Sequence, residues 1–224
     1  MQSILSKIKL VLADSVLRNR IVMTLVLLAL FRLLAVIPIP SIDQVALARF
    51  FGSNQFFSLL NVFSGGGLSN LSIVMLGVGP YITGSIIMQL LTMMSPRLKA
   101  MYQEEGEIGR RKFSQYSRMI SVPLALLQAI GFIILLQKQG IVPSLDTFNL
   151  AVNVLIVTTG SVLLMWIGEL ITEFGIGNGV SLIIFGGIVA ALPREISQIL
   201  FAYDSTKFIY YVVFALIAAV IVYL

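Results

Sequence analysis

The 224-residue sequence contains neither cysteine nor histidine, and charged residues make up only 11% of it. The first two absences exclude disulfides, thiol nucleophiles, Cys/His zinc sites and histidine general bases. The third sets the chain apart from soluble domains, which average about 25% charged residues. Hydrophobic residues make up 58% of the chain and the mean hydropathy is +1.00. The apolar runs are longer than the about 10-residue alternating strands of membrane barrels, so the sequence predicts a helical membrane protein.

Six apolar segments are the candidate membrane spans. They are Ile21–Ile37, Ile73–Met94, Met119–Leu136, Leu150–Gly168, Val180–Leu192 and Phe208–Leu224. A span needs about 20 residues, so the fifth segment must extend into its flanking turns. The first segment contains Arg32, and a buried guanidinium needs acceptors in a polar network. Alternatively, Arg32 lies close enough to the outer end of its span to snorkel.

The distribution of basic residues predicts the orientation in the membrane. Residues 1–20 form a cytoplasmic region in which Met1–Leu17 has the pattern of a short amphipathic interfacial helix. With the N-terminus inside, the inner regions hold Lys7, Lys9, Arg18, Arg20, Arg97, Lys99, Arg110, Arg111, Lys112 and Arg118. The outer regions hold only Arg49, Lys138, Arg194 and Lys207. The positive-inside rule therefore places the N-terminus in the cytoplasm.

Three polar patterns are candidate sites that have simpler explanations. Glu104, Glu105 and Glu107 lie in a basic loop with no metal-ligand spacing, which indicates a solvated charge run. The glycines of "GIGNG" follow no predicted strand, so a tight turn between helices, with Asn178 as an N-cap, is favoured over a phosphate-binding loop. Glu169 and Glu173 end the fourth span, where pairing with a basic residue or hydration is favoured over proton relay.

The second span is broken near its start. The run "FSGGGLSNLSIVMLGVGPYITGSIIMQLL", residues 63–91, contains three consecutive glycines and then Gly77, Gly79 and Pro80. Non-helical backbone at membrane depth is tolerated only where it lines a cavity or is buried in protein. The break therefore indicates a pore or a transporter.

Four sequence blocks together resemble one family. In order, they are "FRLLAVIPIPSID", the broken run above, "EGEIGRRKFSQYSR" and "GELITEFGIGNGVSLIIFGGIVA". They closely resemble the bacterial SecY family of protein-conducting channel subunits. The resemblance implies an all-α membrane protein with ten spans in two inverted halves. Residues 21–192 would be a five-span half-channel with a cytoplasmic loop at 95–118, and 193–224 an outer loop and a sixth span. Leu224 ends an apolar run without an interfacial anchor, so the chain is expected to be the front part of a longer one.

The resemblance also assigns roles to residues. The plug, about residues 64–76, would be a short half-helix in the outer funnel, loosely held and free to swing aside. It would comprise Leu68, Ser69, Asn70, Leu71, Ser72, Ile73 and Val74. A glycine lead and a Gly–Pro hinge would flank it: Gly65, Gly66, Gly67, Gly77, Gly79 and Pro80.

The pore ring and the lateral gate come from the same resemblance. Val78 and Ile82, and Val180 and Ile184, would supply half of an aliphatic gasket that fits around a passing chain and excludes water when closed. Without the family, these four residues would be interpreted as ordinary lipid-facing or core positions. Thr83 and Gln128 are the candidates at the lateral gate, and plain helix-to-helix hydrogen bonding is an equal alternative for Gln128.

The expected function is passive conduction of unfolded polypeptides across the bacterial cytoplasmic membrane, with lateral release of apolar segments into lipid. No catalytic centre, cofactor or metal is expected. The implied partners are SecE, SecG, the SecA motor ATPase, the ribosome, signal sequences and membrane lipids, with docking at Arg110, Arg111, Lys112 and Arg118. The alternatives are a secondary transporter with a broken-helix site, or a non-conducting fragment or insertion intermediate of the same channel.

Overall fold

The computed structural model describes residues 13–39, 61, 64, 66–68, 70–143, 145–201 and 208–223. The chain divides into two compact units, Met1–Ile188 and Val189–Leu224. Almost all of the predicted amphipathic helix at the N-terminus lies outside the described residues, as do Gly65 and Ser69.

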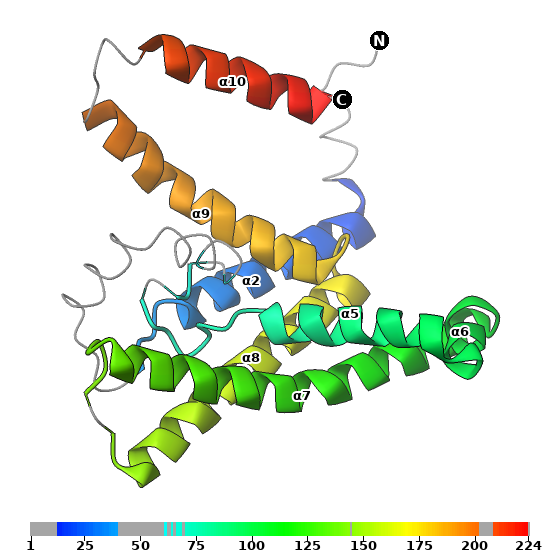
Figure 1. The fold of residues 1–224 in the computed structure, drawn as a ribbon. Helices are drawn as coiled ribbons and strands as arrows, with labels where there is room; N and C mark the ends of the chain where they lie inside the picture. Colours follow the sequence, from blue (N-terminus) through cyan, green and yellow to red (C-terminus); the bar gives the residue numbers. More distant parts are fainter. Residues whose placement is uncertain are drawn as a thin grey trace. The chain divides into compact units, whose positions relative to one another are not determined.

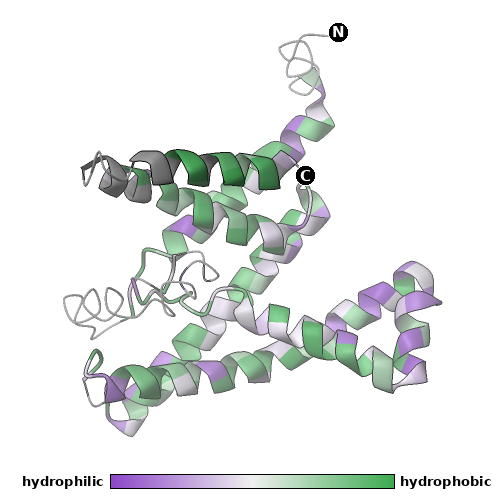
Figure 2. Ribbon diagram, turned by 45° about the horizontal axis from the view of Figure 1, so that its top comes forward, coloured by the Kyte–Doolittle hydropathy of each residue, from purple (hydrophilic) through white to green (hydrophobic). Residues whose placement is uncertain are grey.

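Helices account for each predicted span. They are α2 (Ser15–Leu34), α5 (Gly79–Met94), α6 (Pro96–Gln103), α7 (Gly106–Lys138), α8 (Thr147–Phe174), α9 (Gly179–Phe201) and α10 (Phe208–Tyr223). The described ranges contain no β-strand, only an isolated bridge between Pro38 and Ser72. Gly106–Lys138 and Thr147–Phe174 are long and apolar enough to cross a membrane, and α9 and α10 contain shorter apolar stretches. The second unit holds the end of α9 and the almost uniformly apolar α10 (Figure 2).

The segment predicted as a cytoplasmic loop, residues 95–118, is mostly helical, and its place on the cytoplasmic side stays a prediction. Pro96 begins α6, and Gly106, with a φ of 63°, turns the chain into α7, which then runs without interruption into the third span. A pair four residues apart, Glu107 and Arg111 at 2.9 Å, supports the first turns of α7. Hydropathy marked only the apolar part of this helix because its first turns are polar (Figure 2).

The breaks in the chain have local causes. Asp14 caps α2 by accepting hydrogen bonds from the amides of Val16 (2.8 Å) and Leu17 (3.4 Å). Pro80 lies in the first turn of α5, where its missing N–H costs nothing. The described residues that precede Gly79, from Gly66 onward, form consecutive turns, so the half-helix expected there is not observed in them.

α5 and α7 lie side by side, and α6 joins them at one end (Figure 1). The buried positions of α7 recur every four residues and are mostly small: Gly109, Phe113, Ser117, Ser121, Ala125, Ala129 and Ile133. On α5, a Cβ added to Gly84 would lie 3.0 Å from the carbonyl oxygen of Ser117. Small residues therefore bring the two backbones together, as in other membrane helix pairs.

Two apolar cores fill the first unit. The first contains Leu71 and Met75, which lie among side chains from the end of α7 and the start of α8. The second contains Phe31 of α2, Val74 and Val78, which pack on the end of α8 and the start of α9. The turn segment before α5 thus contributes to both cores.

We expect Gly84→Leu to lower the stability of the folded chain by about 1–3 kcal/mol, because it overpacks a closed backbone contact. Gly131→Leu on α7 is the control, since a Cβ there meets nothing within 4 Å. The measurement is the midpoint of heat-induced loss of monodisperse protein in detergent. Equal midpoints for the two variants would show that Gly84 is not at a helix contact.

Candidate functional site

The four residues assigned to the pore ring lie in one apolar cluster. Val78 precedes α5 and is 1% exposed, whereas Ile82, Val180 and Ile184 are half-buried and pack on the same core. The structure therefore brings together two pairs that are about a hundred residues apart in the sequence. Their role as a ring stays a prediction.

A cavity of about 790 Å³ opens beside three of these residues, Ile82, Val180 and Ile184. The rest of its lining is mostly polar and charged: Tyr81, Ser85, Ile86, Gln89, Glu107, Arg110, Arg111, Ser114, Gln115, Arg118, Glu169, Thr172, Glu173, Asn178 and Ser181. Most of these residues belong to the end of α8 and the start of α7, toward the region predicted to be cytoplasmic. The cavity thus combines aliphatic side chains at the start of α5 and α9 with a charged wall.

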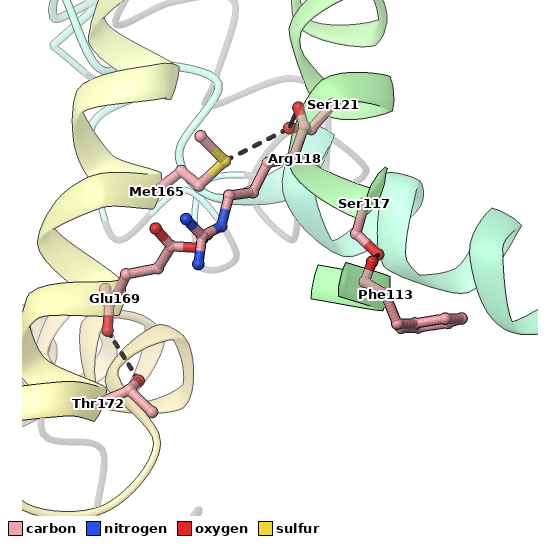
Figure 3. A network of polar contacts seen from close by, with 8 residues as sticks. Phe113, Ser117, Arg118, Ser121, Met165, Glu169 and Thr172 are labelled. Atoms are coloured by element: carbon pink, nitrogen blue, oxygen red, sulfur yellow. Dashed lines mark hydrogen bonds and ion pairs between the residues drawn. The ribbon is translucent and has the colours of Figure 1, made fainter. Parts of the chain in front are cut away.

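An ion pair between Arg118 of α7 and Glu169 of α8 crosses this wall (Figure 3). Beside it, the Ser121 hydroxyl donates to the sulfur of Met165 at 3.4 Å, a second link between the two helices. The predicted pairing of Glu169 with a basic residue is confirmed. Because Arg118 faces a carboxylate in the cavity, it is better placed to shape the cavity than to dock a partner.

The other basic residues assigned to docking are more accessible. Arg111 pairs with Glu107, and both side chains are about four-fifths exposed. Lys112 lies 3.9 Å from Glu105, also at the surface, which agrees with the predicted solvated charge run. Arg110 lines the cavity mouth together with Arg111.

The plug segment is more deeply buried than expected. Leu71 and Val74 are fully buried, Leu68 is 3% exposed and Ser72 is fully buried, while Asn70 is exposed. The residues from Leu71 to Val74 are therefore not loosely held, although Ile73 and Val74 do pack in the same cluster as the ring residues. Leu71 instead enters the core between α7 and α8.

Backbone hydrogen bonds hold the same segment on both sides of Ser72. The Ile39 amide donates to the Leu71 carbonyl at 2.9 Å, and the Ile73 amide donates to the Ile37 carbonyl at 3.0 Å. Leu71 adopts a φ of 40°, which a leucine accepts only when its surroundings determine it. The chain after α2 and the chain before α5 are therefore paired by antiparallel backbone hydrogen bonds over a short stretch.

Helix α8 fixes the end of the segment through two small residues that the sequence reasoning missed. A Cβ on Gly160 would overlap the carbonyl oxygen of Ile73, so only glycine fits there. The neighbouring Ser161 hydroxyl donates to the Gly77 carbonyl at 2.9 Å. The only sequence signal was a Gly–Ser pair inside an apolar run, which is also common at ordinary helix contacts.

The glycines assigned to the hinge serve two different structural purposes, backbone conformation and close packing. Gly66 and Gly77 have φ values of 84° and 60°, which glycine tolerates best. Gly67 is a packing glycine instead, because a Cβ there would lie 2.9 Å from the Ser72 hydroxyl oxygen. A Cβ on Gly66 would lie 3.2 Å from Nη1 of Arg32, so the guanidinium that the sequence singled out lies against the glycine lead.

The two gate candidates are not joined directly by any contact of the described residues. The Thr83 hydroxyl donates to the Gly79 carbonyl of its own helix at 3.0 Å. Gln128 is half-buried on α7. A gate role for either residue stays a prediction.

Comparison with known proteins identifies the family. The SecY family profile matches residues 72–224. The chain belongs to the SecY family. The protein translocase subunit SecY of Pseudomonas aeruginosa is 50% identical over 170 residues, which cover 75% of this chain and 38% of the relative. The SecY subunit of Porphyra purpurea is 44% identical over 209 residues, 92% of this chain and 50% of the relative.

Solved structures support the SecY fold. A structure described as a protein conducting channel aligns with a TM-score of 0.58 at 21% identity, over 78% of this chain and 36% of that one. Sec61 in a canine ribosome–channel complex from the endoplasmic reticulum gives the same TM-score and coverage. The all-α polytopic membrane fold is thus confirmed. The chain spans about two-fifths to one-half of the length of these SecY relatives.

We expect Pro38→Cys/Ser72→Cys to form a disulfide on mild oxidation. The flanking hydrogen bonds make residues 38 and 72 a non-hydrogen-bonded antiparallel pair, whose Cα atoms lie about 4.5 Å apart, within disulfide range. Pro38→Cys/Asn70→Cys is the control, because such diagonal neighbours lie about 7–8 Å apart. The chain has no cysteine of its own, so counting free thiols by mass is unambiguous. Cross-linking no greater than in the control would contradict the bridge.

Proposed function

We propose that this chain forms one half of a protein-conducting channel, which passes unfolded polypeptides across the membrane and releases apolar segments sideways into lipid. One observation carries the proposal: two pairs of aliphatic residues converge beside the charged cavity. Family membership supports it. The residues that complete the ring are expected in the part of the relatives that this chain does not match.

The ring works as a gasket. Val78, Ile82, Val180 and Ile184 offer no hydrogen-bonding groups, so the ring accepts a translocating chain of any sequence. In the closed state, an aliphatic constriction excludes water and ions by dewetting. The fully buried position of Val78 suits a ring that is closed at rest.

The cavity is proposed as the cytoplasmic entrance. Most lysines and arginines lie on the side of the membrane that also holds the N-terminus, which places the α6–α7 end in the cytoplasm. The bacterial cytoplasmic membrane is the proposed location. A polypeptide would enter along the polar wall and meet the ring at the start of α5 and α9.

The movable part of the plug is proposed to end before Leu71. Asn70 is exposed, and the residues that follow it are held by the Pro38–Ser72 bridge and by α8. Leu68, which precedes Asn70, is buried in the same core as Leu71, so opening would have to break that contact. Opening would then displace the chain before this anchor. The bend at Gly66 supports a hinge on that side.

The partners are proposed from the family and from the charge on the molecule. The exposed Arg111 and Lys112, with Arg110 at the cavity mouth, offer a basic face to SecA or the ribosome, which would supply the energy. SecE and SecG are the proposed companion subunits. Signal sequences and lipids would meet the chain at the gate near Thr83 and Gln128. No catalytic role is proposed.

We expect Ile82→Ser and Ile184→Ser, introduced into the complete channel, to raise the resting ion conductance in planar bilayers severalfold. A hydroxyl in the ring lets water wet the constriction. Phe185→Ser is the control, because this neighbouring side chain is 59% exposed and does not line the cavity. If both ring variants conduct no more than the control, the ring assignment is wrong.

A further inference from the structure

The turn between α8 and α9 carries the "GIGNG" sequence, whose glycines have so far been given no role in the channel. It comprises Gly175, Ile176, Gly177 and Asn178, and α9 begins at Gly179. Asn178 caps α9 by accepting the Ser181 amide at 3.0 Å, which confirms the predicted N-cap. The ring residues Val180 and Ile184 lie in the first two turns that follow.

Thr172, near the end of α8, bonds on both sides of this turn. Its hydroxyl donates to the Gly168 carbonyl at 2.8 Å, the bond drawn in Figure 3. The same oxygen accepts the amide of Gly179 at 2.9 Å. One hydroxyl thus ties the first residue of α9 to the last turns of α8.

The hydroxyl of Thr24 on α2 makes the same two kinds of hydrogen bond, one within its own helix and one to the turn. It donates to the Arg20 carbonyl at 2.9 Å and accepts the Ile176 amide at 3.1 Å. Thr24 is 8% exposed and Ile176 is 40% exposed, so this bond is partly buried and its loss would leave the Ile176 amide without its partner on the α2 side. The turn is therefore held by two threonines, one on each side.

Close backbone contacts surround these bonds. A Cβ on Gly175 would overlap the Thr24 hydroxyl, and a Cβ on Gly179 would overlap the Gly168 carbonyl oxygen. A Cβ on Gly168 would lie 3.2 Å from a methyl group of Val180. The backbones of α8 and of the start of α9 therefore meet directly at Gly168 and Gly179, so a shift of the turn would also move Val180.

Beyond its start, α9 has less support. Ile183 is fully buried in the second core, but Phe185, Ile188 and Leu192 are 40–59% exposed. The first two turns of α9 are therefore positioned by the contacts of Ile183 in the second core and by the turn that precedes them.

We propose that Thr24 and Thr172 are positioning residues for the pore ring: their hydroxyls hold the α8–α9 turn and so place Val180 and Ile184 at the constriction. This inference rests on the proposed ring. It gives α2, which contributes no ring residue, a direct influence on the seal of the channel.

The test uses Thr→Val variants, which keep the side-chain shape and remove the hydroxyl, in the complete channel. We expect Thr24→Val and Thr172→Val each to raise the resting ion conductance by up to about tenfold, the factor that corresponds to about 1.4 kcal/mol, near the upper worth of one hydrogen bond. Thr172→Ser should restore the wild-type conductance. A single cysteine at Ile184 should also react faster with a thiol reagent added from the cytoplasm.

The matched control is Thr158→Val on α8. The Thr158 hydroxyl makes the same backward bond, to the Val154 carbonyl at 2.7 Å, and Thr158 is 8% exposed, as is Thr24, whereas Thr172 is more exposed. If Thr24→Val and Thr172→Val both conduct no more than this control, the proposal is overturned. It is also overturned if these two variants fail to accumulate while Thr158→Val accumulates normally, because the threonines would then serve folding rather than the ring. If Ile82→Ser and Ile184→Ser leak while the threonine variants do not, only this inference fails; if none of them leaks, the ring itself is wrong.

Discussion

The contact of Ile73 with Gly160 is the constraint on which the rest of the structure depends. It brings the backbone of the segment before α5 against the backbone of α8, and a single added methyl group would prevent it. The Ser161 hydroxyl then fixes the Gly77 carbonyl at 2.9 Å, one residue before Val78. Because Val78 immediately precedes α5, α8 determines where the second span starts and where its ring residues lie.

α8 therefore sets both halves of the local ring. Toward one end, Gly160 and Ser161 hold the segment that delivers Val78. Toward the other end, Gly168 and Thr172 hold the start of α9, which delivers Val180. The helix contributes no ring residue, yet it is the common frame for the two pairs. The ion pair from Glu169 to α7 lies at the second of these contacts, between Gly168 and Thr172, and faces the charged cavity.

The sequence predicted the helices well where apolar length decides, and less well where polar backbone contacts decide. All six apolar segments contain helices, and the break before α5 follows from Gly79 and Pro80. The helices within residues 95–118 were not predicted because their turns are polar and hydropathy marks only apolar runs, while the contacts of α6 with α5 and α7 leave no local pattern in the sequence. The burial of Leu71 was missed because a segment rich in glycine and serine is typical both of mobile chain and of closely packed backbone. The sequence alone does not distinguish these two cases. The bond between Thr24 and Ile176 joins residues 152 positions apart, a distance over which no local pattern gives information.

Amide hydrogen exchange on the complete channel, at rest and with an arrested translocating chain, tests the anchoring of this segment by α8 most directly. The amides of Ile73, Met75 and Gly77 donate to the carbonyls of Ile37, Ser72 and Val74, all of which lie outside the part proposed to move. We expect them to stay as protected as the core of α8 in both states, while the residues up to Asn70 exchange faster once substrate is engaged. Loss of protection across the whole segment, from Gly66 to Gly77, on substrate engagement would contradict the account.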